Sequence, residues 1–392
     1  MRQRAYFVNP FLLIFLVSFL SINKLSAQTA SSSDVYLPAL SPIVTAASSL
    51  SIVTDARSAA LGGLGVATEA DAVSAYFNPA KLSRTGNSYG VSVAYLSWLS
   101  AITDGIGIAD LTGYFRPSFL GAERKHTFGV SLRRMNIDDV HVFGKSGSIT
   151  HTFSPFEASA QLSYAYALSD KWSFGTGLRY FYTAGSSGHL SYYPSVGNFT
   201  FDLGALFTDY LDAEKKHKLT AGASLLNIGP KLKIGESSKS LFMPTMLRAG
   251  VGYQTRFAKN ISLASYLELE KLLVPSYPIG KDSDGTTDLI DEYYSTTALQ
   301  GIFASFSDAP EGFGEELREY TPALGIEAGY NDLAFLRLGY KYMHPSKGSD
   351  SGFSMGVGVK YKFVRFDFAY FAAISARNPQ NGTLRLSLTG SF

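Results

Sequence analysis

The chain has 392 residues and a net charge of +2, and its charged residues make up 17% of the total against a typical share of about 25%. There is no cysteine and the basic residues are scattered, which excludes a disulfide framework and argues against a nucleic-acid partner. Tyr (24) and Phe (28) far outnumber Trp (2), and such aromatics suit the interfacial girdles and lipid-facing strands of membrane barrels.

The N-terminal residues have the order of a secretory signal peptide. Arg2 and Arg4 precede an apolar run over residues 11–20, and the small-residue site Leu25-Ser26-Ala27 follows. We expect residues 1–27 to be removed. The apolar run is shorter than the roughly 20 residues that a spanning helix needs, and no later stretch reaches that length without a charge or a break. The pattern therefore argues against a helical membrane protein.

Residues 38–85 are rich in Ala, Ser and Gly and lack strand alternation. Asp55 is placed to cap a short helix that starts at Ala56 and stops at Gly62-Gly63, and a second helix is predicted from residue 69 to the break at Asn78-Pro79. Small residues let such helices pack inside a barrel. We expect residues 28–85 to form a periplasmic N-terminal segment and a hatch, with 38–85 in the periplasmic half of a barrel over residues 86–392.

From residue 86 onward, segments with apolar and polar residues in alternation follow one another, as in strands with one wet and one greasy face. They predict an all-β transmembrane fold, a 14-stranded antiparallel outer-membrane β-barrel, and an even count is usual for single-chain bacterial barrels. The predicted strands are 87–99, 102–116, 124–137, 155–169, 171–185, 196–210, 217–228, 244–257, 261–273, 321–330, 333–343, 352–363, 364–375 and 381–392.

The links between these segments alternate in length, as periplasmic turns and extracellular loops of such barrels do. Links after even-numbered strands are mostly short, whereas the long ones are 138–154, 186–195, 229–243, 274–320 and 344–351. The connection 274–320 is too long to be a structureless loop, so we expect it to be folded or functional. The last strand alternates up to Phe392, which looks like an outer-membrane assembly signal, and we expect its deletion to lower assembly.

The inward faces of the predicted strands carry charges that a lumen accepts and lipid rejects. They allow two interpretations, an ion-pair lattice that supports the wall and a permeation path. The residues are Arg133, Arg179, Arg248, Glu268, Glu270, Arg337, Lys341, Lys360, Arg365, Asp367 and Arg385.

Two stretches carry a resemblance to a known family. Gly65, Glu69–Asp71, Tyr76-Phe77, Asn78-Pro79-Ala80 and Leu82 resemble the hatch of FadL-type fatty-acid transporters, which plugs a fourteen-stranded barrel. Together with the segments 55–67 and 301–317, this motif resembles the PorV branch of that superfamily, found in the type IX secretion system. The resemblance implies a shuttle that binds the C-terminal signal domain of secreted cargo at a large translocon barrel and delivers it to a surface sortase complex.

Aromatic side chains in the extracellular loops are the candidate contacts for cargo or partners, because aromatics are enriched at protein interfaces. The alternative is a lid that packs its own aromatics into the barrel mouth. The candidates are His141, Phe143, Tyr192, Tyr193, Phe242, Tyr293, Tyr294, Phe303, Phe306 and Phe313. An Asp-rich run at 282–285 lacks the rest of an EF-hand loop, so neither a metal nor a cofactor is expected.

Two other functions stay open. A FadL-type transporter of hydrophobic small molecules needs an apolar pocket in the lumen, and the inward residues offer little such surface. A lipid A or lipopolysaccharide hydrolase needs a Ser/His pair near the rim, for which His151 or His189 would have to serve. No G-x-S-x-G, H-E-x-x-H or Walker motif occurs, so we expect no enzyme. The remaining expected partners are outer-membrane lipid and lipopolysaccharide, and no nucleic acid.

Overall fold

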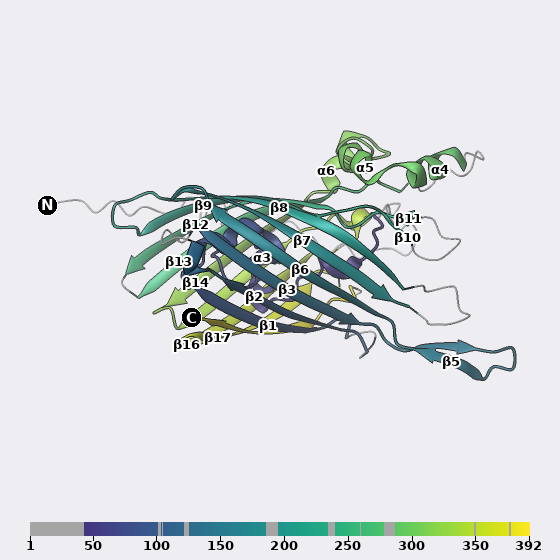
Figure 1. Cartoon of the computed structure of the whole chain (residues 1–392), viewed down its shortest axis with the longest axis horizontal. Coiled ribbons are helices and arrows are strands. Elements are labelled where there is room, and N and C mark those ends of the chain that lie inside the picture. Colours follow the sequence, from purple (N-terminus) through teal and green to yellow (C-terminus); the bar gives the residue numbers. More distant parts are fainter. Residues whose placement is uncertain are drawn as a thin grey trace, which may run out of the picture.

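Fourteen strands close into a single antiparallel barrel in the computed structural model (Figure 1). The structure describes residues 43–100, 103, 105–120, 125–185, 195–233, 240–258, 260–277, 287–348, 350–375 and 378–392. Barrel strands that follow each other in the chain pair with each other, and β18 pairs with β1 to close the wall. The strands are β1 (Tyr89–Ser97), β2 (Gly107–Phe115), β3 (His126–Asn136), β6 (Phe156–Ala167), β7 (Trp172–Ala184), β8 (Val196–Tyr210), β9 (His217–Ile228), β12 (Met246–Ala258), β13 (Ile261–Leu272), β14 (Thr321–Tyr330), β15 (Ala334–Lys341), β16 (Gly352–Tyr361), β17 (Val364–Ala373) and β18 (Thr383–Ser391).

The fourteen strands and the closed barrel confirm the fold predicted from alternation, with boundaries that differ by a few residues. The sequence did not predict two small hairpins within the long connections, β4 (Val140–Phe143) with β5 (Ile149–Phe153) and β10 (Leu232–Lys233) with β11 (Ser240–Leu241). Their strands are too short for the period-two pattern to stand out.

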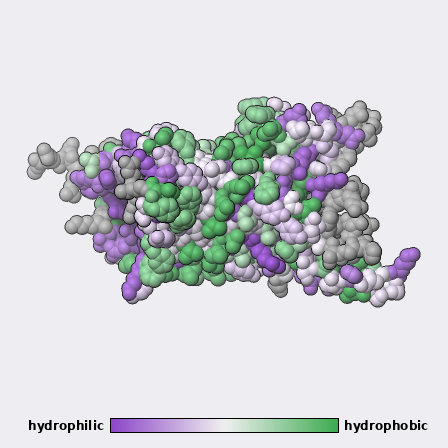
Figure 2. Space-filling model, viewed as in Figure 1, coloured by the Kyte–Doolittle hydropathy of each residue, from purple (hydrophilic) through white to green (hydrophobic). Residues whose placement is uncertain are grey.

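The two faces of the wall differ as alternation requires. On β18, Leu384, Leu386 and Leu388 are exposed, whereas Arg385 and Ser387 point inward and are buried. Figure 2 shows a hydrophobic belt across the outside of the barrel, between more polar ends. An apolar outer belt is what a bilayer requires of a barrel wall. Among the described residues, no helix is long and apolar enough to cross a membrane.

Tight turns gather at one end of the barrel, here called the turn end, and long connections at the other, the loop end (Figure 1). The turn end contains the links 331–333 and 362–363, and β1 starts and β18 ends there. Phe392 lies beside them: its ring packs at a tilt against Phe363 with centroids 4.8 Å apart, and its backbone N–H donates to the carbonyl of Tyr89 over 2.8 Å. These contacts tie the last strand to the first, while the assembly role of Phe392 stays a prediction.

The N-terminal hatch lies inside the barrel and has four short helical turns. They are η1 (Ser48–Ser51), α2 (Ala56–Ala60), α3 (Ser74–Phe77) and η2 (Pro79–Arg84). Asp55 caps α2 as predicted, accepting a hydrogen bond from the Ser58 backbone N–H over 2.8 Å. The second helix starts later than predicted because the Asp71 backbone N–H bonds to the Ser74 hydroxyl and keeps the intervening residues in a turn.

The hatch reaches further through the barrel than predicted. Its η2 turn lies in the expected half, since Arg84 donates to the carbonyls of Ser169 and Asp170 in the β6–β7 turn. Its first described residues lie near the loop end instead, where the Ala46 backbone N–H donates to the carbonyl of Phe242. The expectation that all of 38–85 sits in the turn-end half was therefore wrong for η1. Leu50 packs there in an apolar cluster, which holds η1 at that depth.

Inward charges form ion pairs, as the lattice interpretation required. Arg179 pairs with Asp202 over 3.2 Å, and Arg248 pairs with Glu268 over 2.9 Å and Glu270 over 2.7 Å. All five side chains are buried. These charges therefore pair between neighbouring strands of the wall rather than line an open water-filled lumen.

Candidate functional site

The connection between β13 and β14 folds into three helices above the loop end, which confirms that it is not a structureless loop (Figure 1). They are α4 (Thr287–Ser295), α5 (Ala298–Ala304) and α6 (Phe313–Arg318). Thr297 starts α5 with a capping box, because its hydroxyl accepts from the Gln300 backbone N–H and the Gln300 side chain accepts from the Thr297 N–H. A local sequence signal therefore marks the start of α5.

A cluster of aromatic rings holds the helices on the barrel. The Tyr293 ring lies 5.4 Å from the Phe242 ring and 5.3 Å from the Tyr294 ring, centroid to centroid. Lys231 lies 4.2 Å above the Phe242 ring and donates hydrogen bonds to the carbonyls of Tyr293, Tyr294 and Thr296 at the end of α4. Burial raises the pKa of the Tyr293 hydroxyl to about 12.

This cluster buries two of the ten candidate contact residues. Phe242 is 3% exposed and Tyr293 is 5% exposed, so neither is available to a partner at the surface. The alternative of a lid that packs its own aromatics holds for this part of the connection. Tyr294 is partly buried beside them. These three residues position the loop.

The other three candidate aromatic side chains of the connection are exposed. Phe303 is 74% exposed, Phe313 is 77% exposed and Phe306 is 45% exposed. Leu299 precedes Phe303 by four residues and Leu317 follows Phe313 by four, so each helix presents a pair on one face. We call the five residues Leu299, Phe303, Phe306, Phe313 and Leu317 the aromatic face.

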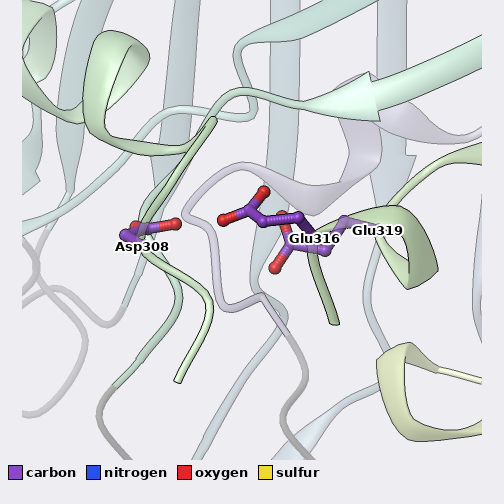
Figure 3. A group of neighbouring side chains, drawn as sticks. All are labelled: Asp308, Glu316 and Glu319. Carbon is purple, nitrogen blue, oxygen red and sulfur yellow. The ribbon is translucent and has the colours of Figure 1, made fainter. Parts of the chain in front are cut away.

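The opposite side of α6 is acidic and faces the barrel rim. Asp308 lies near Glu316 and Glu319, whose carboxylates point toward it in Figure 3. One carboxylate oxygen from each of the three residues lies within 4.8 Å of the other two. Lys271 pairs with Glu319 over 2.5 Å and with Glu316 over 3.3 Å. Desolvation by burial, together with the two nearby glutamates, raises the pKa of Asp308 to about 6.

A second lysine joins this cluster. Lys347 pairs with Glu315 over 2.6 Å and with Glu319 over 3.0 Å. The two lysines supply the positive charge beside the carboxylates, so the cluster reads as an ion-pair network that fastens α6 to the rim. That no metal binds here stays a prediction.

The β4–β5 hairpin projects beyond the barrel at the loop end (Figure 1). Phe143 is 63% exposed, and His141 is exposed with its Nδ1 2.9 Å from the Thr152 hydroxyl. His151 lies on the paired strand, opposite Val142. The candidates Tyr192 and Tyr193 and the alternative catalytic residue His189 lie outside the described residues.

The hatch motif forms a contact with the wall. The Asn78 side-chain amide donates to the carbonyls of Val66 (3.2 Å) and Ala205 (2.9 Å), and its oxygen accepts from the Ala80 backbone N–H. Pro79 starts η2 directly after Asn78, where a missing N–H costs no helix hydrogen bond. Asn78, Pro79 and Ala80 therefore position the hatch.

The residues that sequence reasoning missed are lysines. Strand alternation gives Lys271 the same outward side as Leu267 and Leu269, yet it is 1% exposed because α6 covers it. Lys231 lies in a loop and Lys347 ends the short 3-10 helix η5 (Pro345–Lys347), and neither stands in a repeated pattern. A lysine on the lipid-facing side of a strand end was the one signal available, since lipid rejects it unless something covers it.

A cavity of about 260 Å³ lies between the hatch and the loop-end wall. Ile52, Trp98 and Phe371 line it together with the charged Lys341 and Arg385. The Arg385 Nε donates to the carbonyl of Val53 over 3.0 Å, so the cavity wall includes hatch backbone. Its lining mixes charge with apolar groups.

Comparison with known proteins adds a family and a fold. The family model described as "Type IX secretion system protein PorV" matches residues 39–279. A TodX monoaromatic hydrocarbon channel deltaS2 mutant is similar with a TM-score of 0.50 at 12% identity, over 86% of this chain and 98% of that chain. At that identity the likeness shows the fold alone.

Two further solved structures resemble this chain at a similar level. The Ralstonia pickettii toluene transporter TbuX has a TM-score of 0.47 at 13% identity, over 86% of this chain and 97% of that chain. A Pseudomonas aeruginosa FadL homologue has a TM-score of 0.46 at 11% identity, over 90% of this chain and 100% of that chain. No curated protein matches the sequence.

Proposed function

Because this chain belongs to the PorV family of type IX secretion system proteins, we propose that it is an outer-membrane shuttle that docks secreted protein. In this proposal it binds the C-terminal signal domain of cargo at the translocon barrel and delivers it to the surface sortase complex. Binding takes place at the loop end and requires no turnover of a substrate.

The aromatic face is the observation that carries the proposal. Phe303, Phe306 and Phe313 are exposed, while the helical connection that carries them is fixed to the barrel by the Tyr293 cluster and by Lys271. Anchored aromatics lose little side-chain entropy on binding, and such residues dominate the energy of typical interfaces. Phe143 and His141 on the β4–β5 hairpin are proposed as secondary contacts.

The lumen supports the shuttle over the alternative of a transporter for hydrophobic small molecules. The cavity beside the hatch is lined in part by Glu270, Lys341 and Arg385, whereas an apolar ligand needs a mainly apolar pocket. The lipid A hydrolase receives no further support, because His151 projects with the hairpin rather than sitting in a cleft with a serine.

Alanine substitutions of the aromatic face test the proposal. Phe303→Ala, Phe306→Ala and Phe313→Ala, made singly in the full chain, are expected to leave barrel assembly intact. One or two of them are expected to weaken capture of a purified signal domain by roughly 1–4 kcal/mol. Leu211→Ala is the matched control, because Leu211 is 58% exposed but lies at the turn end.

Two results would contradict parts of the proposal. If the signal domain is captured and none of the three variants changes its affinity, the binding surface lies outside α5 and α6. If no signal domain is captured and labelled fatty acid accumulates through the protein instead, the transporter takes the place of the shuttle.

A further inference from the structure

Six charged side chains, five of them buried and Arg365 partly buried, form a closed ring where the hatch meets strands β14, β15 and β17. Acids and arginines alternate around it, so three carboxylates face three guanidiniums and the ring has no net charge. In order, its members are Asp71, Arg57, Glu327, Arg337, Asp367 and Arg365. The first two belong to the hatch and the other four to the wall.

The hatch side of the ring is centred on Arg57. Its Nε and Nη2 each donate to one oxygen of Glu327 over 3.1 Å, a bidentate pair, and its Nη1 donates to Asp71 over 3.0 Å. The same Nη1 reaches the carbonyl of Glu69 over 3.1 Å. The Arg57 guanidinium therefore links α2, which carries it, to hatch residues 69–71 and to strand β14 of the wall.

The wall side completes the circle. Arg337 donates to Glu327 over 2.5 Å and to Asp367 over 2.7 Å. Arg365 donates to the other oxygen of Asp367 over 2.6 Å and to Asp71 over 3.2 Å. The path thus returns to the hatch, and each carboxylate in it meets two arginines.

Close backbone contact holds the hatch on both sides of the ring. A Cβ added to Gly339 of β15 would lie 2.1 Å from the Gly62 backbone nitrogen. One added to Gly204 of β8 would lie 2.1 Å from the Asn78 side-chain oxygen. At Gly339 only glycine permits such a close approach of hatch backbone, so hatch and wall are closely fitted at these two points.

We propose that this ring is a latch that keeps the hatch closed, so that the barrel interior is not a passage in the intact protein. Moving the hatch separates Arg57 and Asp71 from Glu327 and Arg365 in one step. Each of these four groups then loses one of its two charged partners, on both sides of the contact, and a charge that stays buried with an incomplete set of partners is costly. This inference does not depend on cargo binding at the loop end.

Ion conductance across planar lipid bilayers tests the latch. The full chain is expected to give almost no conductance. Arg57→Glu places a carboxylate between Asp71 and Glu327, and we expect it to raise the mean conductance at least tenfold. Asp71→Asn removes one shared carboxylate with little change of shape, and we expect a smaller rise in the same direction.

The matched control is Asp202→Asn, which breaks a buried wall pair with Arg179 that does not include the hatch. It is expected to stay as closed as the unchanged chain. Heat-modifiable migration on gels shows whether each variant has assembled, and Asp71→Asn decides the question if Arg57→Glu does not assemble. The latch is wrong if the unchanged chain conducts as an open pore, or if the assembled ring variants are as silent as the control.

Discussion

The contact between hatch and wall and the aromatic face at the loop end use opposite chemistry for opposite purposes. At the hatch, Arg57 and its partners are buried, charged and mutually satisfied. At the loop end, Phe303 and Phe313 are exposed and apolar. Among the described residues, no aromatic ring packs against either of them. Removing one member of the first set takes a charged partner from two others, whereas members of the second set act nearly alone.

The comparison separates stability from binding. Buried charges contribute to a single closed structure because each is costly without its partner. Exposed aromatics contribute little to folding but offer area to a partner. Substitutions in the two regions should therefore divide cleanly between the free energy of unfolding and the affinity for cargo.

The largest expected effect tests the buried side of the comparison. Arg337→Met leaves Glu327 and Asp367 facing each other across the site of the lost charge, and we expect it to lower the free energy of unfolding by about 3–5 kcal/mol. Denaturant titration in lipid vesicles measures this. Lys171→Met is the control, since Lys171 is an exposed partner of Asp209 and such pairs contribute about 1 kcal/mol or less. If both substitutions lowered the free energy of unfolding equally, the buried ring would be no more important for stability than an exposed ion pair.

A second prediction sharpens the comparison within one loop. Tyr293→Ala empties the cluster beneath α4 and α5, and we expect it to lower the local stability of the helix pair by about 3 kcal/mol. Amide hydrogen exchange over residues 298–304 measures this. Phe303→Ala, on the exposed side, is expected to leave the exchange unchanged while weakening capture.

Tyr293→Phe is the matched control for that experiment. The Tyr293 hydroxyl is buried and has no hydrogen-bond partner among the described residues, so its removal is expected to leave exchange unchanged. Faster exchange in Phe303→Ala than in Tyr293→Ala would reverse the assignment of supporting and contact residues.

The wall was predictable because alternation reports directly which side chains face lipid. Leu384, Leu386 and Leu388 alternate along β18 and are exposed on its outer side. In the hatch, the helix cap at Asp55 was predictable in the same way from a local signal. The ring was not predictable as a ring. Arg57 and Glu327 are 270 positions apart, and nothing local in a small-residue helix such as α2 indicates which strand its arginine reaches.

The candidate site was predictable in kind but not residue by residue. Tyr293 and Phe303 look equivalent in the sequence, since both are aromatics in the same long connection. Their separation depends on how Lys231 ends α4 and how Phe242, from another loop, fills the space beneath it. Contacts between loops have no period, so composition alone does not separate a lid from a surface.

A third prediction concerns the fit of the hatch. Gly339→Ala forces a methyl group against the Gly62 backbone, which has no flexible end to move aside, and we expect a loss of about 1–3 kcal/mol in the free energy of unfolding. Gly314→Ala is the control, because an added Cβ there meets nothing within 4 Å. Denaturant titration of both variants measures the difference, and a neutral Gly339→Ala would show that the hatch is loose at this point.

The smallest expected effect lies between the two regions, at the acidic side of α6. The pKa of Asp308 is raised to about 6 from an ordinary value of 3.8, first by desolvation and then by Glu316 and Glu319. The folded state therefore holds this proton more tightly than the unfolded state does. The resulting penalty is absent below about pH 4, grows between pH 4 and 6, and is complete above pH 6.

Asp308→Asn removes that penalty and keeps an oxygen to accept the Ser276 backbone N–H. We expect the local stability of α5 and α6 to rise by about 1 kcal/mol at pH 8 and to stay unchanged at pH 4. The gain is smaller than the full linkage value because Asp308 is partly exposed and its charge is screened. Protection factors over residues 298–318 at the two pH values measure the gain. Glu311→Gln, an exposed partner of Arg318 on the outer side, is the control and should show no such dependence. A loss at pH 8 in Asp308→Asn would mean that the carboxylate is needed in its charged form, and the network around Lys271 would then extend to Asp308.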